Sequence, residues 1–295
     1  MSNFSLLSQF LIIIFAAIAC IVIGLDVEKE ASKIDRTPTK LQNDNTNYFN
    51  NVQTPKIDPP NPPTEKIETG LSSAAKAITS SASATYKTTP AFEQYQPKYI
   101  QVTIHPSNYG DRYIKDVYGN SLNNLPIVVL HETTNSVMSA INTFRTFHSN
   151  ESNQVSYHAL ITLDGTIIYL VPSDKRAFGA GNSEFKSSKG IETVKTNPNL
   201  SSSVNNFAYH ISLETPLDGR GEPNQKYHSG YTESQYKSLA WLLALSDIPD
   251  NRITTHQNVD RSNLRFDPRS FDFERLFQFL HAYRQPAIAN ISTPN

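Results

Sequence analysis

The chain has 295 residues, a hydrophobic share of 38% and a formal net charge of −1 at pH 7. A chain of this length holds one large domain or two smaller ones. Its acidic and basic residues balance, so the composition gives no excess of positive charge for binding nucleic acid, and we expect no nucleic-acid partner. The one cysteine, Cys20, excludes an intrachain disulfide and a Cys-rich zinc module. Any metal ion in this protein must therefore be held by His, Asp or Glu.

The N-terminus carries an uncharged apolar run from Phe10 to Leu25. Its length suits a membrane-spanning helix or an export signal with a long apolar region. Ala17–Cys20 loosely resembles a lipoprotein cleavage box, but the apolar run continues past the cysteine, which favours an uncleaved anchor. We therefore expect residues 1–25 to be a signal anchor or signal peptide. The protein is then expected in the cell envelope, exported and membrane-anchored on the periplasmic face, or secreted if the N-terminus is cleaved.

Residues 26–92 have the composition of a linker, rich in Asn, Thr, Ser, Ala, Lys, Asp and Pro. Such a segment cannot bury enough apolar area to offset the entropy of ordering its backbone. Its Pro-rich part, Asp58–Pro63, is expected to be extended and stiff. We therefore expect a disordered spacer that holds a domain away from a membrane, and a short disordered tail at residues 289–295.

Residues 93–288 contain the periodic segments expected of one globular domain. Four segments predict strands: 127–130, 155–163, 166–171 and 206–214. The first is a continuous apolar run, which is typical of a central strand covered on both faces. The second and third flank Asp164 and Gly165, a sequence that predicts a hairpin.

Helical periodicity occurs in three segments of this domain. After Thr133 or Thr134 as the expected cap, apolar residues fall on one side of a helix at Val137, Ile141, Phe144 and Phe147. Residues 232–245 form the second predicted helix, with Thr232 as its cap, and residues 271–283 form the third. The predicted fold class is therefore α/β: a single domain with a central mixed β-sheet flanked by helices.

His131, His256 and Asp267 are the candidate metal ligands. His131 directly follows the first predicted strand, and open α/β sheets place their ligand crevices at such strand ends. His256 and Asp267 lie in the turn-rich segment after the second predicted helix. Two imidazoles and one carboxylate leave one position of a tetrahedral Zn²⁺ open for water. Taken singly, each residue also has an ordinary structural explanation, as a hydrogen-bonded histidine or as an aspartate that starts a turn.

Several motifs follow one another in a characteristic order. They are Val128–Thr134, Val155–Ile161, Asp164–Gly165, Tyr169–Pro172, Arg176–Ser183, Ile211–Glu214, Thr254–Gln257 and Arg265–Pro268. In this order the chain resembles the type 2 N-acetylmuramoyl-L-alanine amidases, zinc enzymes related to phage T7 lysozyme and to peptidoglycan recognition proteins. The resemblance covers about Ile127 to Phe279, and the linker and N-terminus lie outside it.

The resemblance implies that the three candidate ligands bind Zn²⁺ and that Glu214 is the general base or proton shuttle for the attacking water. In a strand, Glu214 shares one face with His210 and Ser212, which suits a carboxylate beside a metal. The alternative for Glu214 is a glutamate at a strand edge paired with a surface cation.

Further residues near these motifs are interpreted as follows, all but His158 through the same resemblance. Arg265 stands where the family usually has Lys, so it is expected to stabilise the oxyanion, while an arginine pKa above about 12 makes it a poor proton donor. Tyr157 matches a position that is catalytic in some relatives, with packing as the alternative. Gly179 replaces the family's usual histidine, which is expected to alter substrate contacts, and His210 partly fills the gap. His158 is expected to point to the opposite sheet face and to be structural.

The function that the resemblance implies is zinc-dependent hydrolysis of the amide bond between N-acetylmuramic acid and L-alanine in peptidoglycan, for cell-wall remodelling or turnover. The expected partners are peptidoglycan or muropeptides and, through the N-terminal apolar segment, a membrane. We expect a monomer. Two alternatives stay open: a peptidoglycan-binding module without catalysis, and a zinc peptidase of other specificity.

Overall fold

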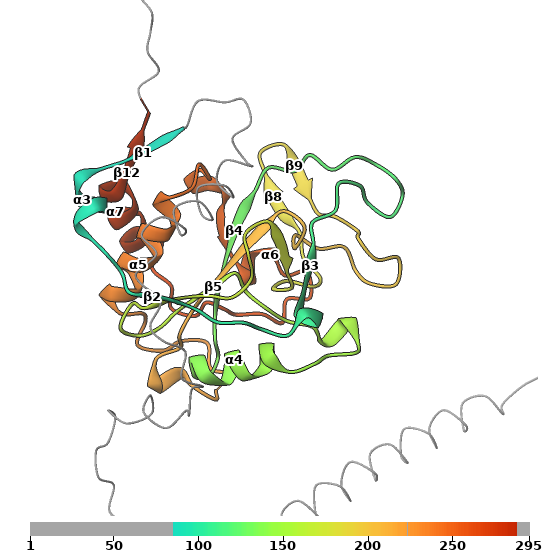
Figure 1. Ribbon diagram of the computed structural model, residues 1–295, viewed down its shortest axis with the longest axis horizontal. Coiled ribbons are helices and arrows are strands. Elements are labelled where there is room, and N and C mark those ends of the chain that lie inside the picture. The colour runs from blue at the N-terminus through green and yellow to red at the C-terminus, as the bar shows by residue number, and fades with distance from the viewer. Residues whose placement is uncertain (1–84, 223, 288–295) are drawn as a thin grey trace, which may run out of the picture. The chain divides into compact units, whose positions relative to one another are not determined.

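The computed structural model describes residues 85–222 and 224–287 (Figure 1). The expected N-terminal anchor, the expected tail and all but the end of the expected linker lie outside these residues. None of the helices in the described ranges combines the length and the apolar character that a membrane span requires.

A six-stranded mixed sheet forms the centre of the fold, in the order β11–β4–β10–β5–β6–β2. Its strands are β2 (Tyr99–Gln101), β4 (Ile127–Glu132), β5 (Ala159–Ile161), β6 (Ile167–Tyr169), β10 (Ala208–Leu213) and β11 (Ile253–Thr255). Strands β11, β4, β10 and β5 pair in parallel, as do β6 and β2. Strands β5 and β6 are antiparallel and form the hairpin predicted at Asp164–Gly165, where Gly165 has a φ of 86°. The predicted mixed sheet is confirmed.

Helices cover both faces of this sheet, as Figure 1 shows. The helices are α3 (Pro90–Gln94), α4 (Val137–Arg145), α5 (Glu233–Ala244), α6 (His256–Val259) and α7 (Phe273–Tyr283), with single 3₁₀ turns at Pro106–Asn108, Glu151–Asn153, Leu217–Gly219 and Asp250–Arg252. On one face, α5 and α7 pack against Val128 and Leu130 of β4. On the other, α6 packs near Val129, and α4 packs against Leu160 of β5. The sheet is therefore the middle layer of three.

The start of α4 differs from the sequence prediction. Ser136, rather than Thr133 or Thr134, is the N-cap, and its side chain accepts a hydrogen bond from the main-chain N–H of Ser139. Thr134 instead has a φ of 58°, a left-handed conformation that belongs to the preceding turn. The helix ends at Arg145, so Phe147 lies beyond it and is 63% exposed. The predicted cap is wrong, and so is the predicted place of Phe147 on the apolar side of this helix.

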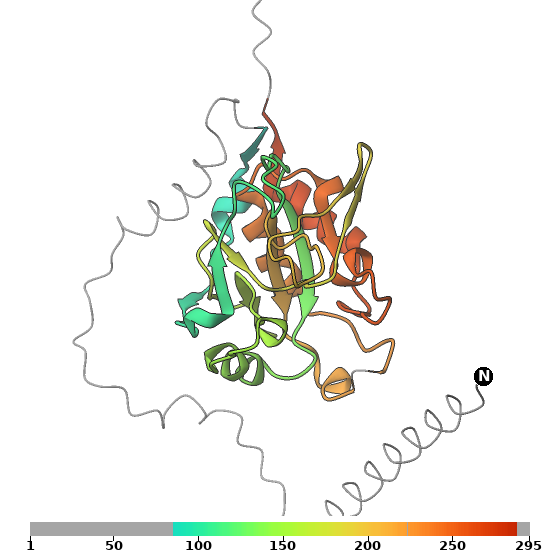
Figure 2. The same cartoon turned by 90° about the vertical axis from the view of Figure 1, so that its right-hand side faces the viewer.

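The ordered domain also begins earlier than the sequence suggested. Residues 86–92, which the sequence placed in the linker, form β1 (Tyr86–Thr88) and the first part of α3. Strand β1 pairs antiparallel with β12 (Arg284–Pro286), and the two lie side by side in Figure 2. Phe92 stacks on Trp241 of α5, with ring centroids 5.3 Å apart. One aromatic side chain and a terminal strand pair thus fix a segment of linker-like composition.

Two short antiparallel ribbons complete the secondary structure that supports the sheet. They are β3 (Tyr109–Asp111) with β7 (Lys175–Ala177), and β8 (Phe185–Ser187) with β9 (Gly190–Glu192). Phe185 of β8 belongs to the buried cluster that also contains Val129 and Val259. The ribbon β8–β9 therefore helps to cover the sheet face on which α6 lies.

The capping box of α5 leads to a stability prediction. The Thr232 hydroxyl accepts a hydrogen bond from the Gln235 N–H at 3.1 Å and donates one to the Leu163 carbonyl at 2.7 Å. Replacing Thr232→Ala should lower the free energy of unfolding by about 1 kcal/mol, as measured by urea denaturation. Thr232→Ser keeps the hydroxyl and should lose less than half as much. An equal loss in both variants would contradict the capping explanation.

Candidate metal centre

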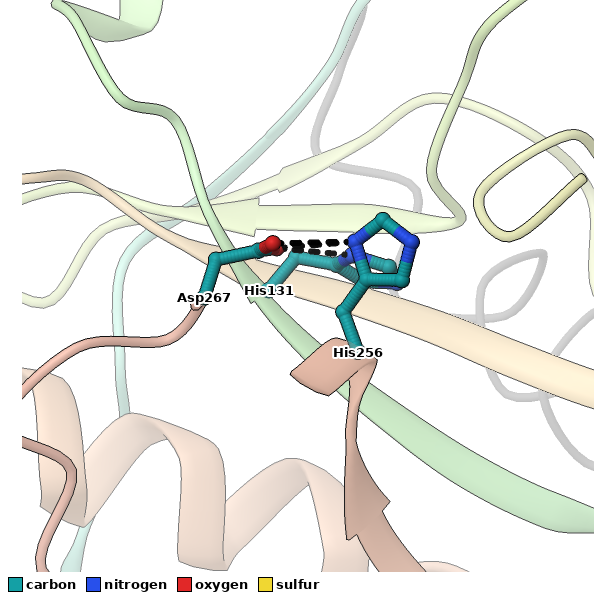
Figure 3. A group of neighbouring side chains, drawn as sticks. All are labelled: His131, His256 and Asp267. Carbon is teal, nitrogen blue, oxygen red and sulfur yellow. Dashed lines mark hydrogen bonds and ion pairs between the residues drawn. The ribbon is translucent and has the colours of Figure 1, made fainter. Parts of the chain in front are cut away.

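The structure brings together the three residues that the sequence singled out as metal ligands. One ligand atom each from His131, His256 and Asp267 lies within 4.8 Å of the others. Nδ1 of His256 is 3.0 Å from Oδ1 of Asp267, and Nδ1 of His131 is 3.3 Å from Oδ2. Figure 3 shows the carboxylate of Asp267 directed at both imidazoles. The same nitrogen of each histidine therefore faces the carboxylate.

The register of two parallel strands explains why the histidines meet. Thr255, the last residue of β11, is paired with Leu130 of β4. The residues that follow, His256 and His131, therefore emerge next to each other at the carboxyl ends of neighbouring parallel strands. His256 is also the first residue of α6, where the Thr255 side chain accepts a hydrogen bond from the Asn258 N–H. A strand register and a helix cap together fix the two imidazoles.

The third residue, Asp267, is held by its own main chain and by a neighbouring ion pair. Its carbonyl oxygen accepts a hydrogen bond of 2.9 Å from the N–H of Gln257, directly after His256. Two residues beyond Asp267, the buried guanidinium of Arg269 donates to the carboxylate of Glu132 at the end of β4. The loop that carries Asp267 is thus fastened to α6, which begins with His256, and to β4, which carries His131.

Glu132 is the centre of a buried polar group that the sequence did not indicate. Besides the Arg269 ion pair, its carboxylate is 2.9 Å from Nε2 of His228 and accepts a 2.9 Å hydrogen bond from the Tyr231 hydroxyl. Arg269 also donates to the carbonyl oxygen of Gly219 at 2.8 Å. A charged pair with satisfied partners can remain buried, and removing one partner is costly. No local sequence signal links these residues, because they meet only in the folded chain.

Burial and neighbouring charges set the protonation states of the ligands. Burial lowers the pKa of His131 to about 4, the charges of His256 and Arg265 add to the lowering, and the hydrogen bond with Asp267 opposes it. Burial alone would raise the pKa of Asp267, but His256 and His131 outweigh it and hold the pKa well below its ordinary value. At neutral pH the site therefore offers a neutral imidazole and a carboxylate, which are the forms that bind metals.

Tyr157 lies against the cluster. Its ring stacks on the imidazole of His131, with centroids 4.5 Å apart, and Phe144 of α4 packs edge-on against it. Burial raises the pKa of Tyr157, the charge of Asp267 adds to the rise, and the charge of Arg265 opposes it. The phenol is therefore protonated at neutral pH. Its hydroxyl makes no hydrogen bond to any described residue, so the contacts it makes are packing contacts.

Glu214 and Arg265 lie around the cluster and not within it. The Glu214 carboxylate, at the end of β10, forms an ion pair of 2.6 Å with Arg220. It also accepts hydrogen bonds from the N–H groups of Leu163, at 3.0 Å, and Val137, at 3.4 Å. Arg265 is exposed, and its charge is among those that act on the pKa of His131. Within the described ranges, neither side chain is bonded to the three candidate ligands.

Strand β10 contributes two buried polar residues beside the ligands. Nδ1 of His210 is 2.9 Å from Nε2 of His131, and the register pairs Ser212 with His131. The Ser212 hydroxyl is buried and has no hydrogen-bond partner among the described residues. Burial lowers the pKa of His210 well below its ordinary value, and His131 and His158 add to the lowering. The predicted shared face of β10 locates these residues, but only the register brings them to His131.

The contacts of His158 are those of a structural residue. Its Nδ1 accepts a 2.9 Å hydrogen bond from the main-chain N–H of His210, and its own N–H donates to the His210 carbonyl. Burial lowers its pKa to about 3, and the charge of Arg112 adds to the lowering. His158 therefore fixes the main chain of β10 behind the cluster.

The donor set fits a divalent metal ion. Two imidazole nitrogens, from β4 and the start of α6, converge with one carboxylate from the following loop, and the histidines are almost fully buried. Nitrogen and oxygen donors of this kind suit several divalent ions, among them Zn²⁺, and three protein donors leave a position for a water or substrate. The arrangement can therefore hold a metal with a reactive open position.

Three comparisons with known proteins bear on the family of this chain. A sequence model of the N-acetylmuramoyl-L-alanine amidase family matches residues 122–270. No curated protein sequence matches the chain.

Similar solved structures include an AmpD derivative, at 24% identity over 64% of this chain and 97% of that chain, with a TM-score of 0.42. The N-acetylmuramoyl-L-alanine amidase LysCS from Clostridium intestinale has 20% identity, 63% and 97% coverage and a TM-score of 0.38. AmiD from E. coli has 20% identity, 54% and 58% coverage and a TM-score of 0.41.

The buried histidines lead to a prediction on the pH dependence of stability. The folded-state pKa values of His131, about 4, and His158, about 3, lie below the unfolded value of about 6.5. The unfolded chain then binds more protons as the pH falls from about 6.5, so the free energy of unfolding of the metal-free protein should decrease. Urea denaturation with a chelator at pH 7.5, 6.0 and 5.0 measures this. His158→Asn should flatten the dependence, and a pH-independent stability would contradict the prediction.

Proposed function

The chain belongs to the N-acetylmuramoyl-L-alanine amidase family, and from this premise we propose that it cleaves the amide bond between N-acetylmuramic acid and L-alanine of peptidoglycan with Zn²⁺ as its metal. The observation that carries the proposal is the convergence of His131, His256 and Asp267 within 4.8 Å, all inside the matched residues. Each would bind the metal through the atom that now faces the others: Nδ1 of the two histidines and a carboxylate oxygen of the aspartate.

A bound Zn²⁺ ion supplies Lewis acidity, which polarises the scissile carbonyl and lowers the pKa of an attacking water to about 7. The chain's own residues do the rest. Arg265, exposed and acting on the cluster through its charge, stabilises the negative charge that develops on the carbonyl oxygen. Its guanidinium stays protonated, so it acts by charge and hydrogen bonding and not as an acid. Tyr157 keeps its phenolic proton and can donate it in a hydrogen bond to the substrate carbonyl.

Glu214 takes the proton of the attacking water in this proposal. Its position supports the role, because it lies two residues after Ser212, on the same side of β10, and Ser212 is paired with His131. A carboxylate has about four acceptor positions. Arg220 and the N–H of Val137 occupy Oε1. Within residues 85–222 and 224–287, Oε2 accepts only from the N–H of Leu163, which leaves a position on Oε2 for a water. The ion pair with Arg220 fixes the carboxylate.

We also propose the setting in which this chemistry takes place. The apolar run Phe10–Leu25 would export the chain and keep it at a membrane, and the polar segment that follows would let the domain reach peptidoglycan in the cell envelope. Cell-wall peptidoglycan is then the substrate that this arrangement favours over free muropeptides. The domain would act as a monomer.

Digestion of purified sacculi tests the reaction. The full-length protein should release stem peptides with new L-alanine amino termini and leave free muramic carboxyl groups, which mass spectrometry identifies. A chelator should stop the release, and added Zn²⁺ should restore it. Asp267→Asn, which removes one anionic ligand, should lose bound zinc and activity together. Binding of sacculi without cleavage would indicate a binding module, and a cut inside the stem peptide would indicate a peptidase.

The role of Glu214 is tested by separating it from its ion-pair partner. Glu214→Gln should lower kcat by at least about 100-fold, the range of general acid–base catalysis, while zinc content stays unchanged. Arg220→Gln removes the ion pair but leaves the carboxylate, so it should cost much less. Full activity in the glutamine variant would contradict the base role. An equal loss in both variants would show that the ion pair only organises the loop.

A further inference from the structure

Among the described residues, His210 makes the one polar side-chain contact with a candidate ligand that the proposed reaction does not use. Its Nδ1 is 2.9 Å from Nε2 of His131, and both residues are fully buried. Nδ1 of His131 points the other way, to Asp267 at 3.3 Å. In the His131 imidazole, Nδ1 therefore faces the candidate metal site and Nε2 faces His210.

Gly179 provides the space in which the His210 ring lies. A Cβ atom at residue 179 would be 2.4 Å from Nδ1 and 2.5 Å from Cγ of His210, far inside van der Waals contact. Gly179 is buried, and its φ lies outside the left-handed range, so its backbone conformation does not require glycine. Space is the reason for glycine at this position. The structure thus places Gly179 against His210, the residue that contacts the candidate ligand His131, whereas the sequence had suggested an effect on substrate contacts.

The main chain of His210 is fixed independently of its ring. Nδ1 of His158 accepts from the His210 N–H at 2.9 Å, and the N–H of His158 donates to the His210 carbonyl at 2.8 Å. Nε2 of the His210 ring has no hydrogen-bond partner in the part of the chain that the structure describes. The bond with His131 is consequently the hydrogen bond that the ring is positioned to make.

A metal ion at Nδ1 of His131 requires the proton on Nε2, and a buried N–H needs an acceptor. We propose that His210 is a positioning residue whose Nδ1 accepts this proton in a hydrogen bond and so orients the His131 ring toward the metal, with Gly179 as the residue that makes room for it. The proposal rests on zinc binding at His131, His256 and Asp267. Partners of this kind fix the tautomer and the orientation of a metal-binding histidine.

Zinc affinity of the folded full-length protein, measured by competition with a chromophoric chelator, tests the proposal without reference to activity. His210→Phe keeps a ring of similar size but removes the acceptor, and it should weaken zinc binding about 10- to 100-fold. His210→Asn places an amide oxygen near the position of Nδ1 and should retain most of the affinity. Urea denaturation shows whether each metal-free variant is folded.

The outcomes separate this inference from the proposed function. If the wild-type protein does not bind zinc, the metal centre itself is wrong and the inference falls with it. If the wild type binds zinc and a folded His210→Phe variant binds equally well, the inference alone is overturned. Loss of affinity in His210→Asn as large as in His210→Phe would also overturn it, because the acceptor would then have no specific effect.

A double-mutant cycle tests the part assigned to Gly179. Gly179→Ala should displace the His210 ring and weaken zinc binding by itself. In a His210→Ala background the added methyl has room, so Gly179→Ala should cause no further loss. Fully additive losses would show that Gly179 does not act through His210 and would overturn this part of the proposal.

Discussion

The parallel register of β11, β4 and β10 is the constraint on which the rest of the site depends. It pairs Thr255 with Leu130, so His256 and His131, which follow them, lie next to each other at the carboxyl ends of their strands. It also pairs Ser212 of β10 with His131. A shift of one residue would send each of these side chains to the opposite face, into the apolar layer under α5 and α7. The buried apolar residues of these strands therefore help to hold the metal cluster in place, because they fix the register.

Burial of so many polar groups at one sheet edge has to be compensated. Glu132 and Arg269 neutralise each other on one side of β4, and their partners include the loop carbonyl oxygen of Gly219. On the other side, His131 shares its nitrogens between Asp267 and His210. The bonds of Glu132 to Arg269 and of His131 to Asp267 and His210 each join segments far apart in the chain. The same contacts that satisfy the buried groups also fix the geometry of the ligands.

The sequence predicted the features that depend on local pattern and on motif order. Apolar continuity located β4, Asp164–Gly165 located the hairpin, and the spaced motifs located the three candidate ligands. The cap of α4 failed because Thr134 adopts a left-handed conformation, which composition does not reveal. The bond of Arg269 to Glu132 spans 137 residues, and the bond of His210 to His131 spans 79. Contacts between residues so far apart in the sequence depend on strand order and register, which local sequence patterns do not reveal.

Two departures from the resembled family have different physical consequences. Arg265 in place of lysine changes an exposed cation, so the site keeps its positive charge and loses only a group able to release a proton. Gly179 in place of histidine changes a buried position, where any lost volume or hydrogen bond must be replaced. The ring of His210 replaces the lost volume, because it fills the space beside Gly179, and it supplies a hydrogen-bonding group, because its Nδ1 contacts Nε2 of His131. Glycine at the buried residue 179 therefore depends on histidine at residue 210, whereas arginine at the exposed residue 265 depends on no second residue.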